Sequence, residues 1–443
     1  MIYVQQANLP ISYIQLYFPH QQADALKIDK GVGSINSHCH PVALRVLAQR
    51  QVLRGTKRAT REQFINEVEQ FGTEIQLTHR SYAHSVGIVA LSRTISQLMP
   101  LLQEALTEPR LDVDEVEQSK RAYIAELEAR YDEDHSLAWL WLSRRLFYGH
   151  QLWENYSVES KHIEELTPEM ISEAWPNIFS ASTVLPCITS DLSVSQINTS
   201  LNPLLKALPH SSLNLECITP LIKREQNRLS LVHKPNKKQA LLFIAHPTLP
   251  PEHPQSLALQ VALCALGGTF SSPLMYEVRT KRGLSYGAYA GIKGEGKARF
   301  VCLHTTPDAQ QALDTLEVML SVYNKAVLGE LTDEQINFAK EYLINAHPFS
   351  IETPAMRAAL TANSQLMGIN ANKVLNLPNW ISPLTVDEIR QAAKDHLSLT
   401  GLDILVFGDQ EKALLGIDKQ IQNLIHIDQT QILSATAMPE DML

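Results

Sequence analysis

The pattern of apolar and polar positions predicts the same order of elements in both halves of the chain. Strand-like runs occur at Ile11 to Phe18 and at Gln239 to Ala245, and apolar helical segments follow at Val42 to Leu53 and Leu257 to Leu266. Alternating strands and long amphipathic helices come next in each half. Because the strands occur in groups, without regular alternation with helices, the pattern predicts an α+β fold.

The two halves also share local signals at a constant spacing. Thr167 opens a helix and Asp191 ends an apolar run in the first half, and Thr385 and Asp409 do the same in the second. The offset is 218 residues in both cases, from 167 to 385 and from 191 to 409. A further pair of helices keeps nearly the same offset. This agreement predicts an internal duplication.

The duplication predicts two tandem homologous domains, each a mostly antiparallel sheet packed with helices. Residues 1–207 form the first domain and residues 227–443 the second. Each is then about 200 residues long, a usual domain size. Residues 208–226, which contain proline and serine, are predicted to be an exposed linker.

A glycine-rich stretch from Gly267 to Tyr289 predicts a helix, a tight turn and a strand in close succession. Ser271 or Ser272 can cap the helix, and a proline follows in its first turn. Gly283 is the expected left-handed residue that ends the helix.

The strand after this turn has a period-two pattern that places Leu284, Tyr286 and Ala288 on one face. Arg279 and Tyr286 lie on either side of the turn, so both side chains can point toward the same space. Taken alone, the arginine can complement the carboxyl end of the helix and the tyrosine can belong to the core.

Common catalytic and metal-binding motifs give little support to other chemistries. No two of the 16 histidines are four residues apart, which excludes both common two-histidine zinc motifs. His38, Cys39 and His40 form a small cluster that can bind a stray metal ion, but no further ligand is near in sequence. The five cysteines are scattered and are expected to be reduced or buried thiols.

Two further motifs match catalytic patterns only in part. Residues 283–287 fit the G-x-S-x-G pattern of serine hydrolases around Ser285. In those enzymes the serine lies in a sharp turn with a strand before it and a helix after it, whereas here a helix precedes the serine and a strand follows. Residues 291–297 nearly fit a phosphate-binding loop, yet Ala298 stands at the magnesium position and a strand-like run follows. A glycine-rich hairpin is the simpler prediction.

Composition limits the class of protein. The chain has 443 residues, of which 44% are hydrophobic, and a net charge of -9 without long runs of one sign. This balance argues against a nucleic-acid surface. No apolar run reaches the roughly 18 residues that a membrane span needs. The first residues do not resemble a leader, so the chain is expected to be cytoplasmic as it stands, or periplasmic if a leader was removed.

The spacing R-x-x-x-G-L-x-Y from Arg279 to Tyr286 resembles the arginine/tyrosine motif of the pitrilysin/insulinase family of zinc metallopeptidases. The resemblance covers essentially the full length, and residues 347–354 are similar to a segment of bacterial members. It implies a metallohydrolase-like fold in which this chain forms half of a clamshell that closes on a peptide.

Active members of that family carry H-x-x-E-H on the first helix, with two histidines as zinc ligands and a glutamate that activates water. Counting back from the sequence R-G-T at residues 54–56, the five motif positions hold Val46, Leu47, Ala48, Gln49 and Arg50. None of these side chains can replace a ligand, and Arg50 puts a fixed cation where the metal would lie. The third ligand of the family matches Glu126, which can equally be a solvated helix residue.

The resemblance implies a non-catalytic subunit, similar to the bacterial chain that keeps the arginine/tyrosine motif and lacks H-x-x-E-H. Such a chain binds no cofactor itself, and zinc is expected in a homologous partner that completes a heterodimer. Arg279 and Tyr286 would reach a carbonyl of an extended peptide substrate in the partner's site. Two alternatives stay open: a scaffold or peptide-binding protein with no catalytic share, and a serine hydrolase that uses Ser285.

Overall fold

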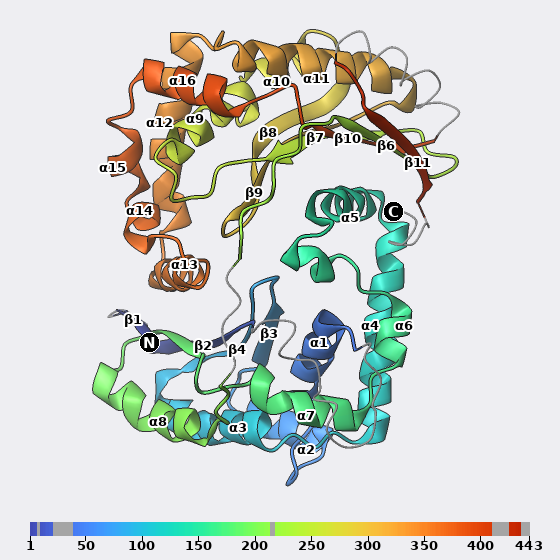
Figure 1. The fold of residues 1–443 in the computed structure, drawn as a ribbon. Helices are drawn as coiled ribbons and strands as arrows, with labels where there is room; N and C mark the ends of the chain where they lie inside the picture. The colour runs from blue at the N-terminus through green and yellow to red at the C-terminus, as the bar shows by residue number, and fades with distance from the viewer. Residues whose placement is uncertain (7–8, 21–38, 213–217, 410–424, 436–443) are drawn as a thin grey trace. The chain divides into compact units, whose positions relative to one another are not determined.

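The computed structural model describes residues 1–6, 9–20, 39–212, 218–409 and 425–435. These residues form two compact units, each built around one sheet and its helices (Figure 1). Unit 1 comprises Met1–Ala129, Ser157–Cys217 and Ile351–Ala371. Unit 2 comprises Arg130–Tyr156, Ile218–Ser350 and Asn372–Leu443. The predicted α+β class is confirmed.

Unit 1 contains a five-stranded sheet in the order β1-β5-β2-β4-β3, in which only β1 and β5 run parallel within the described part. Its strands are β1 (Ile2–Gln5), β2 (Ile11–Pro19), β3 (Ile75–His79), β4 (Ala83–Leu91) and β5 (Leu185–Ser190). Its helices are α1 (Pro41–Gln51), α2 (Arg61–Glu69), α3 (Ile95–Thr107), the first part of α4 (Val113–Asp132), α6 (Ser160–Glu164), α7 (Pro168–Ile178), α8 (Val194–Ala207) and α13 (Pro354–Leu366).

Unit 2 contains a six-stranded sheet in the order β11-β6-β10-β7-β9-β8. Its strands are β6 (Arg228–His233), β7 (Leu241–Pro247), β8 (Ser285–Glu295), β9 (Ala298–Pro307), β10 (Asp403–Gly408) and β11 (Gln429–Ser434). Its helices are α5 (Asp134–Phe147), α9 (Ser256–Gly267), α10 (Pro273–Met275), α11 (Ala312–Val327), α12 (Asp333–Ser350), α14 (Ala371–Leu375), α15 (Leu377–Ile381) and α16 (Val386–His396). None of the helices in the described ranges is both long and apolar enough to cross a membrane.

The two sheets share one strand order, because β6-β10-β7-β9-β8 repeats β1-β5-β2-β4-β3 with the same parallel and antiparallel pairs. A buried lysine contact is repeated as well. Lys120 donates to the carbonyl oxygens of Glu164 at 2.8 Å and Leu166 at 3.1 Å. In unit 2, Lys340 donates to the equivalent carbonyl oxygens of Ser382 and Leu384. The acceptors are 218 residues apart in both cases and the lysines 220, and the internal duplication stays a prediction.

Each unit includes one segment from the other half of the chain. Helix α5 packs on β7 and β10 of unit 2, where Trp139 meets the ring of Phe243 with centroids 4.9 Å apart. Helix α13 packs on β1 and β5 of unit 1, with Ala358 and Ala362 buried against Tyr17. The domain boundaries at residues 207 and 227 refer to the repeat and stay a prediction, since the compact units divide the chain differently.

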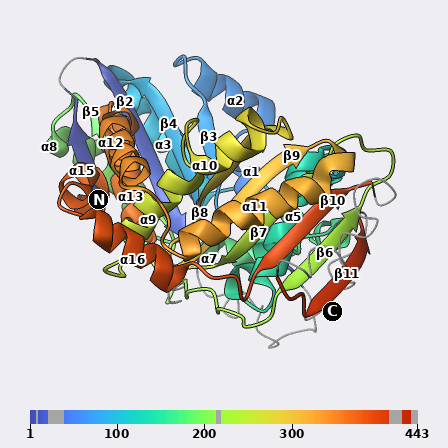
Figure 2. The ribbon, with the colours of Figure 1, turned by 90° about the horizontal axis from the view of Figure 1, so that it is seen from above.

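In unit 2, α9, α10, α11 and α16 lie on one face of the sheet and α5 lies on the other (Figures 1 and 2). Close packing of α9 on the edge strand depends on Gly267. A Cβ atom at this residue would lie only 2.6 Å from the backbone nitrogen of Ala290 in β8. Helix α9 therefore holds β8, and the turn that precedes it, in a fixed position.

Strands β8 and β9 form the glycine-rich hairpin predicted for residues 291–297. The two strands pair antiparallel up to Glu295 and Ala298. Gly294 and Gly296 have φ angles of 99° and 54°, which L side chains rarely adopt. No helix follows this segment, so the phosphate-loop alternative is wrong.

The sheet of unit 1 contains three clustered histidines. The ring of His20 lies 5.2 Å from that of His79 and 5.9 Å from that of His84, between centroids. Burial, with the Arg45 cation facing the cluster from α1, lowers the pKa of His79 to about 4 and those of His20 and His84 well below the usual value. His79 is partly exposed as a residue, but both its ring nitrogens are buried without a hydrogen-bond partner.

We expect the free energy of unfolding to fall as the pH drops from about 6.5 toward 4, because these histidines take up protons on unfolding but stay neutral when folded. His79 alone contributes no more than roughly 3 kcal/mol over this interval. Urea unfolding at several pH values measures the effect. His84→Phe, which keeps a ring between Phe18 and Phe179, should make the pH dependence shallower. The exposed His426, changed to Gln, is the control, and equal slopes in the two variants would contradict this origin.

Candidate functional site

The predicted helix near Arg279 is present but differs in form. Three residues of α10 are followed by a π-helical turn, η4 (Tyr276–Thr280), which carries Arg279. Gly283, with a φ angle of 64°, ends the turn as predicted, and its N–H donates to the carbonyl oxygen of Arg279 at 3.0 Å. Single π-turns occur often at functional sites. Ser272 occupies the cap position but makes no capping hydrogen bond, so that part of the prediction is wrong.

The period-two prediction for the following strand is wrong at Tyr286. Leu284 and Ala288 are buried, whereas the Tyr286 side chain is 85% exposed. The pairing of β8 with β9 shifts register between Ser285 and Ala288. Such an irregularity re-aims a side chain. Tyr286 is therefore a surface residue and not a core residue.

The Arg279 guanidinium lies over two aromatic rings. Its Cζ atom lies 4.4 Å from the ring centroid of Phe270 and 4.7 Å from that of Tyr286. Within the part of the chain that is described, the guanidinium has no hydrogen bond or ion pair. The structure thus brings together the two residues singled out in the sequence. We call Phe270, Arg279 and Tyr286 the arginine clamp.

Phe270 was missed in the sequence, although its signal was present. It lies in the short loop between α9 and α10 and is 67% exposed. A large apolar side chain in a polar, glycine-rich loop seldom serves a core. Together with Tyr286 it limits the movement of the guanidinium through cation–π contacts.

The neighbouring cations differ from Arg279 because both are paired with one carboxylate. Glu277 accepts hydrogen bonds from Arg282 and from Lys281, the latter at 3.1 Å. The Arg282 contact, followed by that of Lys281, lowers the pKa of Glu277. Within the described residues, Arg279 is therefore the cation of this turn that makes no ion pair.

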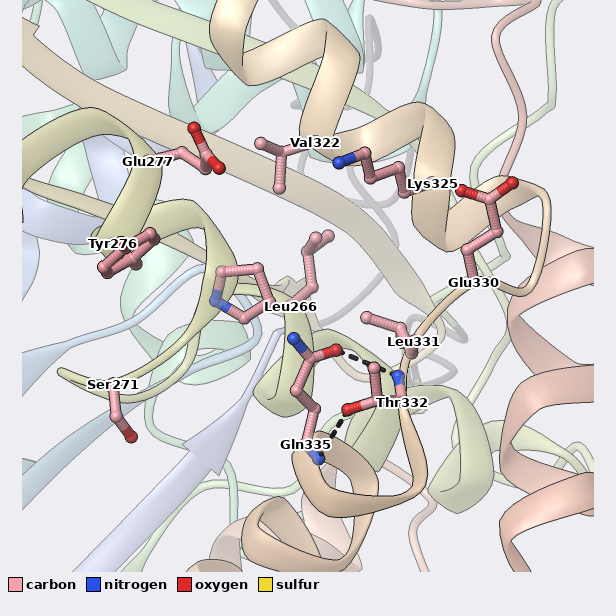
Figure 3. Close-up of a pocket in the computed structure, with 11 residues that line it drawn as sticks. Leu266, Ser271, Tyr276, Glu277, Val322, Lys325, Glu330, Leu331, Thr332 and Gln335 are labelled. Carbon is pink, nitrogen blue, oxygen red and sulfur yellow. Dashed lines mark hydrogen bonds between the residues drawn. The ribbon is translucent and has the colours of Figure 1, made fainter. Parts of the chain in front are cut away.

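A cavity of about 310 Å³ lies beside the same π-turn (Figure 3). Leu266, Val322 and Leu331 provide apolar lining, while the backbone N–H groups of Thr332 and Gln335 each donate to the side-chain oxygen of the other residue. Neither Arg279 nor Tyr286 lines it. The arginine clamp is a surface site that is separate from this cavity.

In unit 1, the positions that match the zinc motif of the family hold side chains that make structural contacts. Arg50 forms a two-point ion pair with Glu126, with N–O distances of 3.0 and 2.5 Å. The guanidinium also lies 4.7 Å from the centroid of Tyr123. Such an exposed pair contributes little stability, typically about 0–1 kcal/mol. It does, however, bring a cation to the carboxylate that would serve as a metal ligand.

Gln49 and Val46 do not fit a metal either. The Gln49 amide donates to the carbonyl oxygens of Thr78 at 3.0 Å and Ser85 at 2.9 Å, which ties α1 to β3 and β4. Val46 packs against the core of the unit. The residues present at these positions cannot hold zinc, because they provide no imidazole and their one carboxylate is paired with Arg50.

The other candidate ligands are also used elsewhere. His40 caps α1, and its Nε2 lies 3.1 Å from the hydroxyl of Ser157. Burial lowers the pKa of His40 to about 3. His38 lies outside the described residues. Among the residues that are described, no group of three or more histidine, cysteine, aspartate or glutamate side chains is placed to hold a metal ion.

Ser285 does not resemble a catalytic nucleophile. Its hydroxyl donates to the carbonyl oxygens of Thr306 at 2.8 Å and Gly287 at 3.2 Å. It lies on an edge strand, and no helix follows it. A nucleophilic serine needs a base within hydrogen-bond reach, and the described contacts of Ser285 include none.

Comparison with known proteins gives a consistent result along most of the chain. The family model described as "Peptidase M16 inactive domain" matches residues 165–343. The "Non-peptidase homolog YmxG" of Helicobacter pylori is 22% identical over 413 residues, which cover 93% of this chain and 92% of that protein. A crystal structure of a peptidase M16 inactive domain from Pseudomonas fluorescens has a TM-score of 0.79 at 20% identity, covering 92% of this chain and 94% of that one. A protease structure from Helicobacter pylori has a TM-score of 0.74 at 14% identity, covering 91% and 96%.

Proposed function

Since the chain belongs to the pitrilysin/insulinase family as an inactive member, we propose that it is the non-catalytic subunit of a zinc metallopeptidase. In this proposal a homologous partner carries the zinc motif, and this chain supplies Arg279 and Tyr286 to the partner's site. The substrate is an extended peptide. The heterodimer, and not the lone chain, is then the peptidase.

One observation carries the proposal: the Arg279 guanidinium contacts two aromatic rings, and its N–H donors are unpaired within the described residues. A buried structural arginine would be paired with a carboxylate, as Arg228 is with Asp403 in the same unit. An arginine kept in one orientation without a counter-ion is suited to a ligand that arrives from outside.

The donors of the arginine clamp match the chemistry of peptide hydrolysis. Zinc in the partner would supply the activated water. As that water attacks, the carbonyl oxygen of the substrate becomes an oxyanion, and the Arg279 N–H groups and the Tyr286 hydroxyl are donors of the right type to stabilise it. Stacking fixes the guanidinium before the substrate arrives, so little reorganisation is needed.

The contacts in unit 1 support the division between two chains. Arg50 pairs with Glu126, and Gln49 is committed to backbone carbonyl oxygens. Gln49 also lacks a group that could accept a proton from water. These positions therefore supply no zinc-activated water, and in the proposal that water comes from the partner chain.

The proposal is tested by reconstitution with a homologous chain that carries H-x-x-E-H. We expect the lone chain to leave a quenched fluorescent peptide intact, and the mixture to cleave it in a manner that chelation of zinc abolishes. Cleavage by the purified lone chain would overturn the proposal. Equal activity of the partner with and without this chain would favour a scaffold with no catalytic share.

A further inference from the structure

We propose that the arginine clamp binds the free C-terminal carboxylate of an extended peptide whose backbone pairs with the edge strand β8. The inference rests on the proposed function in taking a peptide as the ligand, but it concerns the lone chain and needs no metal. It assigns to this chain a ligand class, peptides with a free C-terminus, and a direction of binding.

The geometry of Arg279 favours a planar anion. The rings of Phe270 and Tyr286 both lie close to the guanidinium, with their centroids 4.4 and 4.7 Å from Cζ, while its N–H donors make no hydrogen bond within the described residues. The edge offers parallel N–H donors that match the two oxygens of a carboxylate. A charge-assisted pair of this kind is roughly twice as strong as a neutral hydrogen bond. A carboxamide offers only one oxygen and no charge.

The pairing of the cations in this turn distinguishes Arg279 from its neighbours. Lys281 and Arg282 share the single carboxylate of Glu277, so the three side chains keep one net positive charge, but both cations are held in ion pairs. Further along the surface, burial lowers the pKa of His304 to about 4, so its imidazole is neutral at pH 7. Arg279 is the cation of this turn that makes no ion pair within the described residues, so its N–H donors are available to an anion.

Strand β8 provides a backbone partner for the rest of the peptide. It is the end strand of its sheet, and among the described strands only β9 pairs with it. It is eleven residues long and contains no proline. Proteins usually protect long edges with proline, charge or a covering segment, because unpaired N–H and C=O groups recruit another strand. An edge of this length, with one side unpaired among the described strands, is a candidate site for strand addition.

The position of the clamp sets the direction of the peptide. Tyr286 is the second residue of β8, so the clamp lies at the beginning of that strand. A peptide whose last residue is held there runs from the end of β8 back toward its start. The two strands are then antiparallel.

Aromatic rings extend from this strand across the sheet, from β8 through β9 to α5. Tyr289 is 46% exposed, and its ring lies 5.4 Å from that of His304, which lies 5.6 Å from Trp139 of α5. This row of rings gives apolar side chains of a peptide a surface to pack on. We therefore expect a preference for apolar residues upstream of the carboxylate.

The inferred ligand is also the product of the proposed reaction. Hydrolysis adds water across the peptide bond: the carbonyl carbon gains an oxygen and becomes a carboxylate, and the nitrogen leaves as an amine. The new carboxylate forms where the oxyanion was held. Donors placed for the oxyanion therefore hold the N-terminal product by its new C-terminus.

The test uses the purified lone chain and a fluorescein-labelled peptide of alternating serine and leucine, about as long as β8. It is prepared with a free C-terminal carboxylate or with a carboxamide, and binding is measured by fluorescence anisotropy. We expect the acid to bind about tenfold more tightly than the amide, a ratio that corresponds to about 1.4 kcal/mol. Arg279→Gln should abolish this ratio, and N-methylation of alternate peptide amides should weaken both forms.

The matched control is Arg282→Gln, which changes a cation of the same turn that is already paired with Glu277. It should retain the preference for the acid. Equal affinities of acid and amide for the unchanged chain, absence of binding of either peptide, or loss of the preference in Arg282→Gln would each overturn the inference. Since no partner is present, these results are independent of whether Arg279 contributes to catalysis in the heterodimer.

Discussion

Replacing Arg279 by alanine in the reconstituted heterodimer lowers kcat/KM for peptide cleavage by about 10²- to 10³-fold, as is typical when one oxyanion donor is removed. The loss corresponds to about 2.7–4 kcal/mol of transition-state stabilisation. Arg279 is the donor whose orientation is fixed by stacking on Phe270 and Tyr286. Its removal should reduce kcat more than it raises KM, because the oxyanion exists only during the reaction.

Two further variants separate the parts of the clamp. Tyr286→Phe removes the hydroxyl but keeps the ring over the guanidinium, so the rate loss reports a second donor. Phe270→Ala removes one stacking ring, keeps both donors, and should cause a smaller loss through disorder of Arg279. The ring of Phe270 is exposed, so none of these changes opens a cavity in the core.

Arg282→Ala is the control for the first prediction, since it removes a cation from the same turn. Steady-state kinetics should show little change for this variant, and thermal unfolding should be similar for all four chains. Equal rates for Arg279→Ala and the unchanged heterodimer would contradict the proposed role. In that case the chain would assist its partner only as a scaffold, or not at all.

The elements around the clamp could be predicted because their signals are local. Gly283 ends the turn with a positive φ angle, as the sequence indicates, and helix α9 lies within one residue of the predicted segment at each end. Such features depend on residues within a few positions of each other. The predicted order of a helix before Ser285 and a strand after it, which argues against a serine elbow, is also present in the structure.

The orientation of Tyr286 could not be predicted, because it depends on a partner strand. The shift in register between Ser285 and Ala288 arises from the pairing of β8 with β9. A prediction that assumes strict alternation of side chains cannot include such a shift. The π-turn at Tyr276–Thr280 has no simple pattern of its own. The stacking of Phe270 on Arg279 also requires the loop conformation, which the sequence does not specify.

Contacts between distant segments were likewise outside the reach of sequence patterns. Arg50 and Glu126 are each visible as helix residues, but their pairing spans 76 positions. Similarly, α5 and α13 have ordinary amphipathic patterns that fit any sheet. Which sheet each helix covers is decided by packing, and both pack on the sheet of the other half of the chain. The predicted repeat divides the chain by its sequence pattern, whereas the compact units divide it by the contacts in the folded structure.

Restoring two histidines should give this chain a zinc site. We expect the double variant Val46→His/Arg50→His to retain about one zinc per chain after dialysis, measured by mass spectrometry, whereas the unchanged chain retains far less. Positions 46 and 50 lie one turn apart on the same face of α1. The two-point contact of Arg50 with Glu126 demonstrates that a side chain at position 50 reaches this carboxylate. Two imidazoles and one carboxylate are a common zinc-binding set.

Two controls distinguish a rebuilt site from surface binding by histidine. Val46→His alone should not hold zinc, because Arg50 still pairs with Glu126 and keeps a cation at the site. Glu126→Gln, added to the double variant, should weaken binding by removing the third ligand. Gln49 is retained in the double variant, which preserves its hydrogen bonds to Thr78 and Ser85. Because Gln49 cannot accept a proton from water, the variant should bind zinc without cleaving peptides. Zinc content that is unchanged by Glu126→Gln would refute the assignment of these positions as the remnant of a metal site.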